Sequence, residues 1–371
     1  MQKKYICNLN YFAIVLIVIK NMLHYSTIIV LPSVCENVIE IFAYSIWGIT
    51  LLTSQYKKKY LFMFFLCGCV CIYSCYICKS FIIFSSFMFF CLCMSKKSNE
   101  HEIINIIYKT IFWVLLIHFF AFLIQYLNGS VSRLVDKSGR IRLSLGFSNP
   151  NIVSYYALWC FLGYVYSKKE LIKEEKRTIM LPIALITVVY IFAKSNTLLY
   201  MTIISLLLLN LNIPSKILSI VSKYAFLFIT FIWIILVGLY SSSNSYAIKL
   251  NNIMNSRLYY SCQTEKIYGY SIIGKNIDLD VGLIRKEGYM STSLILDVTY
   301  ANLLYKYGII YVLILALISV VIANCSDDIK KKYLLIWCIF ALSETVSLNF
   351  VICFPPVFAA FLLKERRIEK W

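Results

Sequence analysis

Long hydrophobic runs separated by short polar segments occupy the chain from near its first residue to near its last. A helix needs about 20 residues to cross the hydrocarbon core of a membrane, and shorter runs suffice when flanking side chains reach the interface. By this measure the pattern predicts twelve membrane-spanning helices. They are expected near residues 9–31, 38–54, 60–78, 80–95, 103–127, 151–167, 178–194, 197–213, 217–239, 297–323, 333–348 and 350–363.

The predicted fold is therefore an all-α, polytopic integral membrane protein. No repeat of fixed length and no linker rich in proline, glycine or serine divides the sequence, so residues 1–371 are expected to form a single transmembrane domain. The amino-terminal run lacks a short apolar core followed by a small-residue cleavage site. We therefore expect a retained first span rather than a cleaved signal peptide.

The composition agrees with this class. Hydrophobic residues make up 60% of the chain and charged residues 15%, whereas charged residues account for about a quarter of a typical soluble protein. The formal net charge of +18 is best explained by basic residues in cytoplasmic loops. Nucleic-acid binding is not expected.

The basic residues also predict an orientation. Seven basic clusters fall on one side of the membrane if both termini are cytoplasmic, in agreement with the positive-inside rule. The clusters are Lys3-Lys4, Lys57 to Lys59, Lys96-Lys97, Lys168 to Arg177, Lys216, Lys330 to Lys332 and Lys364 to Lys370. Most segments on the other side carry at most one basic residue.

Two outer segments, 128–150 and 240–296, break that pattern because each contains several cations. Outward cations oppose the insertion bias, so we expect them to serve a function and place the candidate site on the outer face. Segment 240–296 forms a large outer loop that is too long for a passive connection and is expected to contain short helices.

Four arginines in these segments, Arg133, Arg140, Arg142 and Arg257, are candidate ligands for an anion. The planar guanidinium group binds phosphate through a fork of donors, which suits a lipid pyrophosphate or an acidic saccharide. The alternative is that they are solvated loop charges or contact anionic lipid headgroups.

Asn149, Pro150 and Asn151 predict the start of the sixth span. Proline is tolerated in the first helical turn, and an asparagine before it can cap the free amides. In the functional interpretation, Asn151 faces the outer cavity and hydrogen-bonds a sugar hydroxyl, and Asn149 is a further candidate for substrate binding.

Two carboxylates are candidates for proton transfer or for orienting an arginine. Asp297 stands at the start of the tenth span, where it could instead cap the helix, and Tyr300 follows as a candidate substrate contact. Glu344 falls in the outer half of a predicted span, where an ionisable group is costly and needs a cavity or a partner. Its expected partner is an outer arginine. Asp136 is a reserve candidate.

No metal or other cofactor is predicted. Asp278 and Asp280 form a DxD pattern, but three letters in a loop are a weak signal, and nucleotide sugars are not found outside the cell. Cys75 and Cys78 form a CxxC without a second ligand pair. Half of the fourteen cysteines lie in apolar runs, where cysteine behaves as a small hydrophobe.

Taken in order, several motifs resemble the Wzy-type polymerases of capsule and O-antigen repeat units, which are related to the O-antigen ligases. The matching stretches are RLSLGFSNPN (142–151), AKSNTLLY (193–200), LNNIMNSRLYY (250–260), YGYSIIG (268–274), LDVTYANLLYKYGII (296–310) and LSETVSLNF (342–350). The family often has a serine-arginine pair within the second stretch. Here Asn196 replaces that arginine, and Lys194 would supply the charge.

The resemblance implies a glycosyltransferase of the bacterial cytoplasmic membrane. It would transfer a glycan from undecaprenyl pyrophosphate onto an incoming lipid-linked repeat unit, with no metal or nucleotide. Arg140 or Arg142, together with Arg257, would engage the pyrophosphate. The implied partners are lipid-linked glycans, the bilayer, and flippase and chain-length regulator proteins.

Three alternatives remain at this stage. The related ligases tend to carry a histidine in the large outer loop, and its absence from 240–296 favours a polymerase. A flippase for lipid-linked oligosaccharides would need charged residues within its spans and has little use for so long an outer loop. If the protein were a purely structural subunit, the outer arginines would have no function in binding or catalysis.

Overall fold

The computed structural model describes residues 2–53, 58–95, 98–129, 134–135, 141–168, 180–278, 283–284, 290–291 and 295–365. These residues are predominantly α-helical, and their strands form two short antiparallel hairpins. The chain divides into two compact units. Unit 1 contains Met1–Gln55 and Met88–Asn210, and unit 2 contains Tyr56–Phe87 and Leu211–Trp371.

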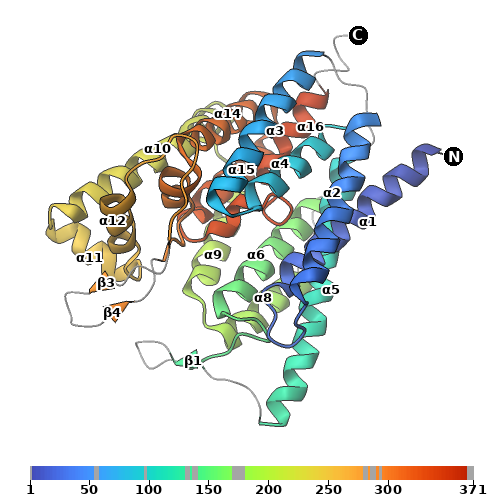
Figure 1. Ribbon diagram of the computed structural model, residues 1–371. Helices are drawn as coiled ribbons and strands as arrows, with labels where there is room; N and C mark the ends of the chain where they lie inside the picture. The colour runs from blue at the N-terminus through green and yellow to red at the C-terminus, as the bar shows by residue number, and fades with distance from the viewer. Residues whose placement is uncertain are drawn as a thin grey trace. The chain divides into compact units, whose positions relative to one another are not determined.

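Unit 1 is a bundle built around helix α6. The helices are α1 (Gln2–Leu23), α2 (Ser33–Thr53), α5 (Glu100–Leu127), α6 (Pro150–Ser167), α8 (Met180–Ala193) and α9 (Asn196–Asn210). Helix α6 packs against α5, α8 and α9, whereas α1 packs against α2 and α5 (Figure 1). Most side chains of α6 are buried, including Trp159 and Phe161, so α6 lies at the centre of the unit.

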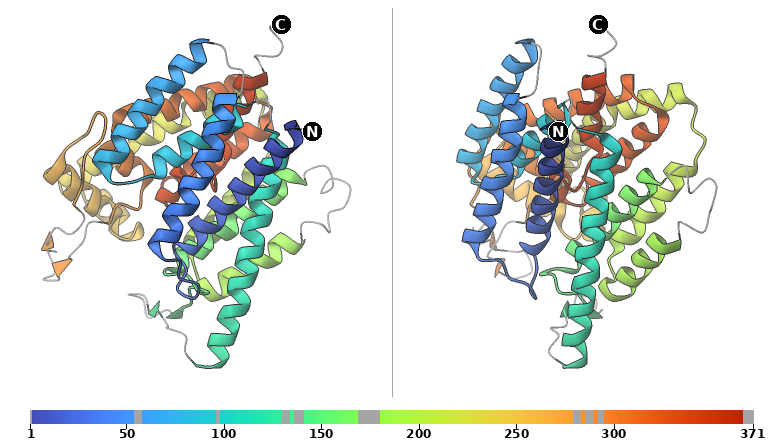
Figure 2. Two further views of the ribbon diagram at one scale, coloured as in Figure 1. Left: turned by 45° about the vertical axis from the view of Figure 1, so that its right-hand side comes forward. Right: turned by 90° about the vertical axis from the view of Figure 1, so that its right-hand side faces the viewer.

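A β-hairpin of strands β1 (Leu134–Val135) and β2 (Ile141–Arg142) belongs to the segment between α5 and α6. Figure 2 shows α5 as the long teal helix that leads to this segment. Helix α4 (Ile82–Cys93) is divided between the two units.

Unit 2 is a second helical bundle, organised around α10. Its elements are α3 (Lys58–Cys78), α10 (Ser215–Ser241), α11 (Ser245–Ile253), α12 (Arg257–Tyr268), β3 (Leu283–Ile284), β4 (Met290–Ser291), α13 (Thr299–Ala301), η2 (Asn302–Tyr307), α14 (Ile309–Cys325), α15 (Asp328–Phe340), η3 (Thr345–Leu348), η4 (Pro355–Val357) and α16 (Phe358–Glu365). Helix α10 packs against α12, α14 and α15. In its core, the Phe226 ring stacks on Trp337 with centroids 5.4 Å apart.

Three helices among the described residues are long and apolar enough to cross a membrane, judged by length and composition: α2, α5 and α10. Shorter apolar helices or helix segments of 10–17 residues lie within α1, α3, α4, α8, α9 and α14. The expectation of twelve continuous spans is therefore not confirmed, although the helical class is.

The expected tenth span, 297–323, is interrupted. A π-helical turn over Asn302–Tyr307 ends at Gly308, which has a φ of +104°, and α14 starts only at Ile309. A Cβ atom on Gly308 would lie 2.5 Å from the carbonyl oxygen of Ile272, so this position requires glycine for space as well as conformation. The span is broken because residues 271–275 pack against it, and their backbone amides and carbonyls hydrogen-bond to the turn.

The two closing spans, 333–348 and 350–363, also differ from expectation. Helix α15 ends at Phe340, turns and short 3₁₀ segments follow, and α16 starts at Phe358. A side-chain hydrogen bond explains part of the difference. Thr299 Oγ1 donates to the carbonyl oxygen of Glu344 at 2.7 Å, so this backbone acceptor has a partner without a helix. Pro355 and Pro356 then prevent an ordinary helix from passing through that point.

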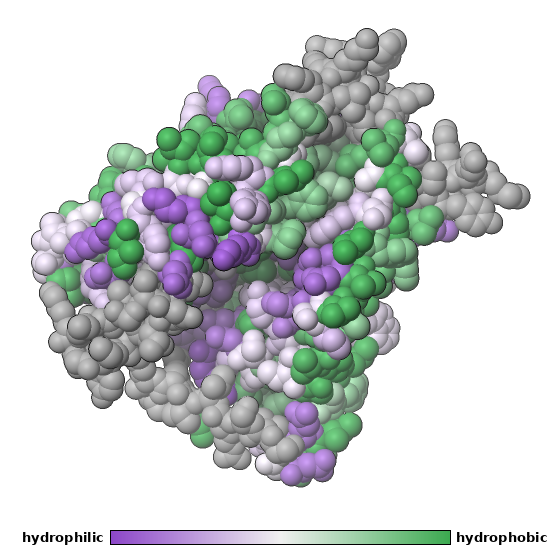
Figure 3. Space-filling model, in the orientation of Figure 1, coloured by the Kyte–Doolittle hydropathy of each residue, from purple (hydrophilic) through white to green (hydrophobic). Residues whose placement is uncertain are grey.

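The expectation of short helices in segment 240–296 is confirmed by α11 and α12. Hydrophilic side chains gather on the surface of unit 2 around these two helices (Figure 3). This contrasts with the exposed apolar residues along α10, such as Phe228, Phe231 and Ile235. The polar end of unit 2 is where the candidate chemistry lies.

Candidate functional site

The described candidate residues fall into two groups, each within one unit. The Arg142 cluster of unit 1 comprises Arg142, Asn149, Asn151, Lys194 and Ser195. The Arg257 cluster of unit 2 comprises Arg257, Asp297 and Glu344. Three other candidates, Arg133, Arg140 and Asp136, lie outside the described residues.

Two neutral oxygens hold the guanidinium group of Arg142. Its Nε donates to the Ala193 carbonyl oxygen at 2.9 Å, and its Nη2 donates to Asn151 Oδ1 at 2.8 Å. The first acceptor belongs to the last residue of α8 and the second to the first turn of α6. Arg142 therefore connects the ends of two helices, and both bonds fix the direction of the guanidinium plane.

The start of α6 has the structure that its sequence predicts. Asn149 is the N-cap residue, and its side chain accepts a hydrogen bond from the Asn151 amide at 2.8 Å, while Pro150 occupies the first turn. The Asn149 side chain is exposed, and that of Asn151 is half-buried. Ser195 Oγ also donates to Asn151 Oδ1, at 3.4 Å, so one amide oxygen joins Arg142 and Ser195.

Lys194 lies at the turn between α8 and α9. It adopts a left-handed conformation with a φ of +45°, and its side chain is exposed. The turn places this lysine directly before buried Ser195, whose Oγ accepts from the Leu198 amide (3.4 Å) in the first turn of α9. A solvent-accessible ammonium group thus stands beside the residues that hold Arg142.

A buried histidine supports the segment that carries the Arg142 cluster. His118 Nδ1 lies 3.0 Å from the Val114 carbonyl oxygen, and Nε2 lies 2.9 Å from Ser26 Oγ. Because a carbonyl can only accept, Nδ1 carries the proton and Nε2 accepts from the serine. The ring also stacks on Phe147, with centroids 4.5 Å apart. Ser26 in turn forms a β-bridge with Phe147, two residues before Asn149.

The Arg257 cluster starts from the turn between α11 and α12. Asn255 and Ser256 have φ values of +53° and +66°, and this turn makes Arg257 the first residue of α12. Asn251 stabilises the turn through its side chain, whose Oδ1 accepts from the Tyr259 amide at 2.9 Å. The left-handed turn thus fixes the direction from which the Arg257 side chain leaves the backbone.

Glu344 has the partner that the sequence predicted. Arg257 Nη2 lies 3.7 Å from Glu344 Oε1, and the two side chains are only 14% and 13% exposed. This distance is too long for a direct hydrogen bond, so the contact is a charge interaction. Partial burial strengthens such an interaction relative to an exposed pair, because water screens it less.

Asp297 lies just before α13 and does not cap it, because Val298 is the N-cap residue and no side-chain cap bond forms. Its side chain is exposed, yet the surrounding chain removes enough water to raise the pKa of the carboxyl. The positive charge of Arg257 acts in the opposite direction and lowers that pKa. Asp297 is therefore an electrostatic neighbour of Arg257, as is Glu344.

Tyr300 is placed differently from its predicted role as a substrate contact. Its side chain is fully buried, and its hydroxyl donates to the Cys338 carbonyl oxygen at 2.8 Å. The ring also packs 5.2 Å from that of Phe226. In this structure Tyr300 joins α13 to α15 in the core of unit 2.

The alternative metal patterns also have structural explanations. Cys78 Sγ donates to the Lys306 carbonyl oxygen at 2.9 Å, which places it against the broken tenth span. Asp278 hydrogen-bonds through its backbone to the Tyr268 hydroxyl, whereas Asp280 lies outside the described residues. Within the described ranges no group of three or more His, Cys, Asp or Glu residues could hold a metal ion.

Sequence reasoning missed Ser195, Ser26 and His118. Ser195 lies inside a stretch that we had singled out, and a buried serine before a helix is a usual capping residue. The role of His118 depends on contacts with residues 26 and 147, and no local pattern reveals such contacts.

No protein-family model matches this sequence, and comparisons with curated proteins and with solved structures find no significant match.

Proposed function

We propose that this protein is a bacterial surface-polysaccharide polymerase of the cytoplasmic membrane. It would cross the membrane about twelve times with both termini cytoplasmic, and shorter or broken helices would serve as some of the spans. Apolar helices such as α2, α5 and α10 support a membrane location, as do the large exposed hydrophobic side chains along them. The distribution of basic residues supports the orientation.

The observation that carries the proposal is the Arg257 cluster. An arginine and two carboxyl groups from segments far apart in the sequence occupy one neighbourhood of unit 2. The sequence alone predicts phosphate binding for Arg257 and proton transfer for the two carboxyl groups. The cation can bind a pyrophosphate, and a neighbouring ionised carboxylate can accept a proton from a hydroxyl.

In the proposed reaction, a hydroxyl of the incoming lipid-linked repeat attacks the anomeric carbon of the donor glycan. A new glycosidic bond forms, and the bond between that carbon and the pyrophosphate breaks. Undecaprenyl pyrophosphate leaves with the electron pair, and Arg257 stabilises its developing charge. The proton of the attacking hydroxyl passes to Asp297 or Glu344. Because the leaving group is already good, alignment and charge stabilisation are the main requirements.

The Arg142 cluster of unit 1 is a separate candidate site for binding a phosphate or sugar hydroxyl groups. Arg142 and Lys194 are cations, and Asn149 and Asn151 offer side-chain amides to hydroxyl groups. Flippase and chain-length regulator proteins would act before and beside this enzyme. The reaction requires neither a metal ion nor a nucleotide.

The test is a size profile of lipid-linked and surface glycans in the host cell. The gene is deleted and then restored as wild type, as Arg257→Ala, or as Lys249→Ala. Lys249 is a matched control because it is an exposed cation in the same outer segment. We expect Lys249→Ala to restore long glycans, and Arg257→Ala to accumulate single repeat units outside the membrane at normal protein abundance.

Three outcomes would overturn the proposal. Repeat units trapped on the cytoplasmic side of the deletion strain would identify a flippase. Long free glycans that are never joined to an acceptor lipid would indicate a ligase. A glycan profile in which deletion changes nothing would remove the connection to polysaccharide synthesis altogether.

A further inference from the structure

A cleft in unit 2 lies between the end of α10 and the middle of α12. It has a volume of 390 Å³ and is lined by Gly238, Ser241, Ser242, Cys262, Glu265 and Lys266. The size is appropriate for a small organic ligand. None of these residues belongs to the Arg142 or Arg257 cluster.

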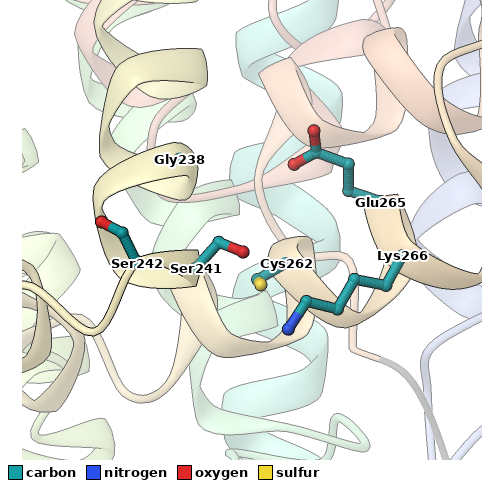
Figure 4. Close-up of a pocket in the computed structure, with 6 residues that line it drawn as sticks. All are labelled: Gly238, Ser241, Ser242, Cys262, Glu265 and Lys266. Atoms are coloured by element: carbon teal, nitrogen blue, oxygen red, sulfur yellow. The ribbon is translucent and has the colours of Figure 1, made fainter.

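The residues that line the cleft carry hydroxyl, thiol, carboxylate and ammonium groups. Figure 4 shows the Ser241 hydroxyl directed from α10 towards Cys262, with the Lys266 side chain reaching towards the same side, whereas the Glu265 carboxylate is directed away from Cys262 at the other edge of the cleft. Gly238 adds no side chain, which leaves room on the α10 side. The Ser242 hydroxyl is occupied, because it donates to the Leu239 carbonyl oxygen at 2.9 Å.

An aromatic ring borders the carboxylate. Glu265 is half-buried and lies next to Tyr270, whose side chain is 42% exposed. Tyr270 packs against Tyr305 with ring centroids 5.5 Å apart, so its ring is supported from behind. A supported, exposed tyrosine offers a flat apolar face to a ligand. The neighbouring carboxylate and hydroxyl groups can hydrogen-bond to polar groups of the same ligand.

These features select among ligands by charge. Glu265 and Lys266 are adjacent and of opposite sign, so the cleft does not present the excess positive charge that phosphate or a nucleotide would need. A neutral molecule with several hydroxyl groups matches the hydroxyl of Ser241, the carboxylate of Glu265 and the ammonium group of Lys266 together. Tyr270 borders Glu265 outside the lining of the cleft, so its face is available to the carbon-bound hydrogens of a longer glycan.

We propose that the cleft between α10 and α12 binds saccharide units of the growing glycan. The inference rests on the proposed polymerase function and adds a holding site to it. Glu265 lies eight residues after Arg257 on α12, which corresponds to about 12 Å along the helix. A glycan held there would leave one end free to reach the Arg257 cluster. Retention of the product between additions would favour long chains.

The experiment uses the full-length protein in nanodiscs of fixed lipid composition. The probe is a fluorescently end-labelled fragment of the host's own surface polysaccharide, released by mild hydrolysis. The variants are Glu265→Gln, which removes the charge, and Ser241→Trp, which fills the cleft from an exposed position on α10. Lys249→Ala is the control. Each variant also restores the deletion strain, and protein abundance in the membrane is measured.

We expect Glu265→Gln and Ser241→Trp each to weaken fragment binding about tenfold or more, the usual result of losing hydrogen bonds to a charged group. In cells both variants should form short products of a few repeats, because the reaction site is intact, but few long chains. Arg257→Ala should bind the fragment with wild-type affinity and make no products.

Several results would overturn the inference and leave the polymerase proposal standing. The first is wild-type binding and glycan length in both variants while Arg257→Ala is inactive. The second is an effect of Glu265→Gln without one of Ser241→Trp, which would mean that Glu265 acts only by supporting Tyr270. Failure of the wild-type protein to bind the fragment would also exclude the holding site. If Arg257→Ala polymerises normally, both proposals fail.

Discussion

The described contacts of the two arginines, Arg142 and Arg257, differ in length and in the type of acceptor. Arg142 donates to a backbone carbonyl oxygen and a side-chain amide oxygen at 2.9 and 2.8 Å, whereas Arg257 faces the Glu344 carboxylate at 3.7 Å. Short bonds to neutral oxygens specify an orientation. A longer contact with a carboxylate specifies mainly a charge, because Coulomb attraction depends little on angle.

This difference suggests that the Arg142 and Arg257 clusters have different roles. An arginine whose plane is fixed suits bidentate recognition of a phosphate that must sit in one place. The Arg257 contact is loose enough for a phosphate to compete with Glu344 as charge develops on the leaving group. The Arg142 cluster would therefore position the substrate, and the Arg257 cluster would respond to the reaction.

The largest expected effect separates the two clusters by replacement with lysine. Arg142→Ala and Arg257→Ala should each lower the polymerisation rate by roughly 10²–10³, as removal of a group that stabilises the transition state does. Arg257→Lys should recover part of the rate, because it keeps the charge. Arg142→Lys should remain as poor as Arg142→Ala, because an ammonium group cannot reproduce the two directed bonds. The measurement is repeat units added per minute in membranes.

Equal recovery by lysine in the two clusters would contradict the comparison. It would mean that Arg142 also acts through charge alone.

The second prediction concerns pH and applies only to the Arg257 cluster. Burial raises the pKa of the Asp297 carboxyl, so this group stays protonated to a higher pH than an ordinary aspartate. If Asp297 accepts the proton, activity must rise with pH through that raised pKa. Arg257 lowers the pKa, so weakening its charge contact should move the rise to higher pH.

The pH profile of the residual polymerisation by wild type, Asp297→Asn and Arg257→Gln checks this prediction. Asp297→Asn should lose the rise, and Arg257→Gln, which removes the positive charge, should shift it to higher pH. An unchanged profile in Asp297→Asn would transfer the role of base to Glu344 or to water.

Sequence features with local causes were predicted well. The start of α6 at Asn149 and Pro150 follows from capping chemistry within four residues, and the short helices of segment 240–296 follow from its length and composition. The pairing of Glu344 with an outer arginine was also predicted, and the structure gives Arg257 as that arginine although the two are far apart in sequence. A charged group within a long apolar run leaves few possible partners.

Features that depend on tertiary contacts were not predictable from hydrophobicity. The run 297–323 is apolar enough for one span, but residues 271–275 pack against it and Gly308 breaks the helix. Tyr300 follows Asp297 closely in sequence, yet the backbone turns between them, so that one is exposed and the other is in the core. Likewise, nothing in the sequence around Arg142 indicates that the Ala193 carbonyl oxygen is its acceptor.

A third prediction tests how Arg142 is held. Asn151→Ala removes the acceptor of Nη2 and leaves the bond to the Ala193 carbonyl oxygen, so one of the directed bonds described for Arg142 is lost. A hydrogen bond to a charged group contributes about 1.5–3 kcal/mol, so activity should fall about tenfold, less than in Arg142→Ala. Asn149→Ala is the comparison variant: it removes the helix cap, which should cost about 1 kcal/mol of stability, and one proposed hydroxyl contact, but it leaves both described bonds of Arg142 in place, so its rate loss should be smaller.

The polymerisation rate and the melting temperature of the two asparagine variants, measured side by side, separate the loss of an Arg142 bond from the loss of the helix cap. A rate loss in Asn149→Ala that exceeds the loss in Asn151→Ala would assign substrate contact to the cap residue instead.

The smallest effect is expected at His118, which acts on the Arg142 cluster only through the chain segment that it supports. His118→Leu leaves the Ser26 hydroxyl without its buried acceptor and should destabilise the protein by about 1–3 kcal/mol. In His118→Gln the amide oxygen can replace Nε2 as the acceptor, so this variant should lose less. The melting temperature in detergent, together with polymerisation at two growth temperatures, measures both effects. Since the Arg257 cluster belongs to the other unit, the pH profile should be unchanged in both variants, and a shifted profile would show that the two clusters are coupled.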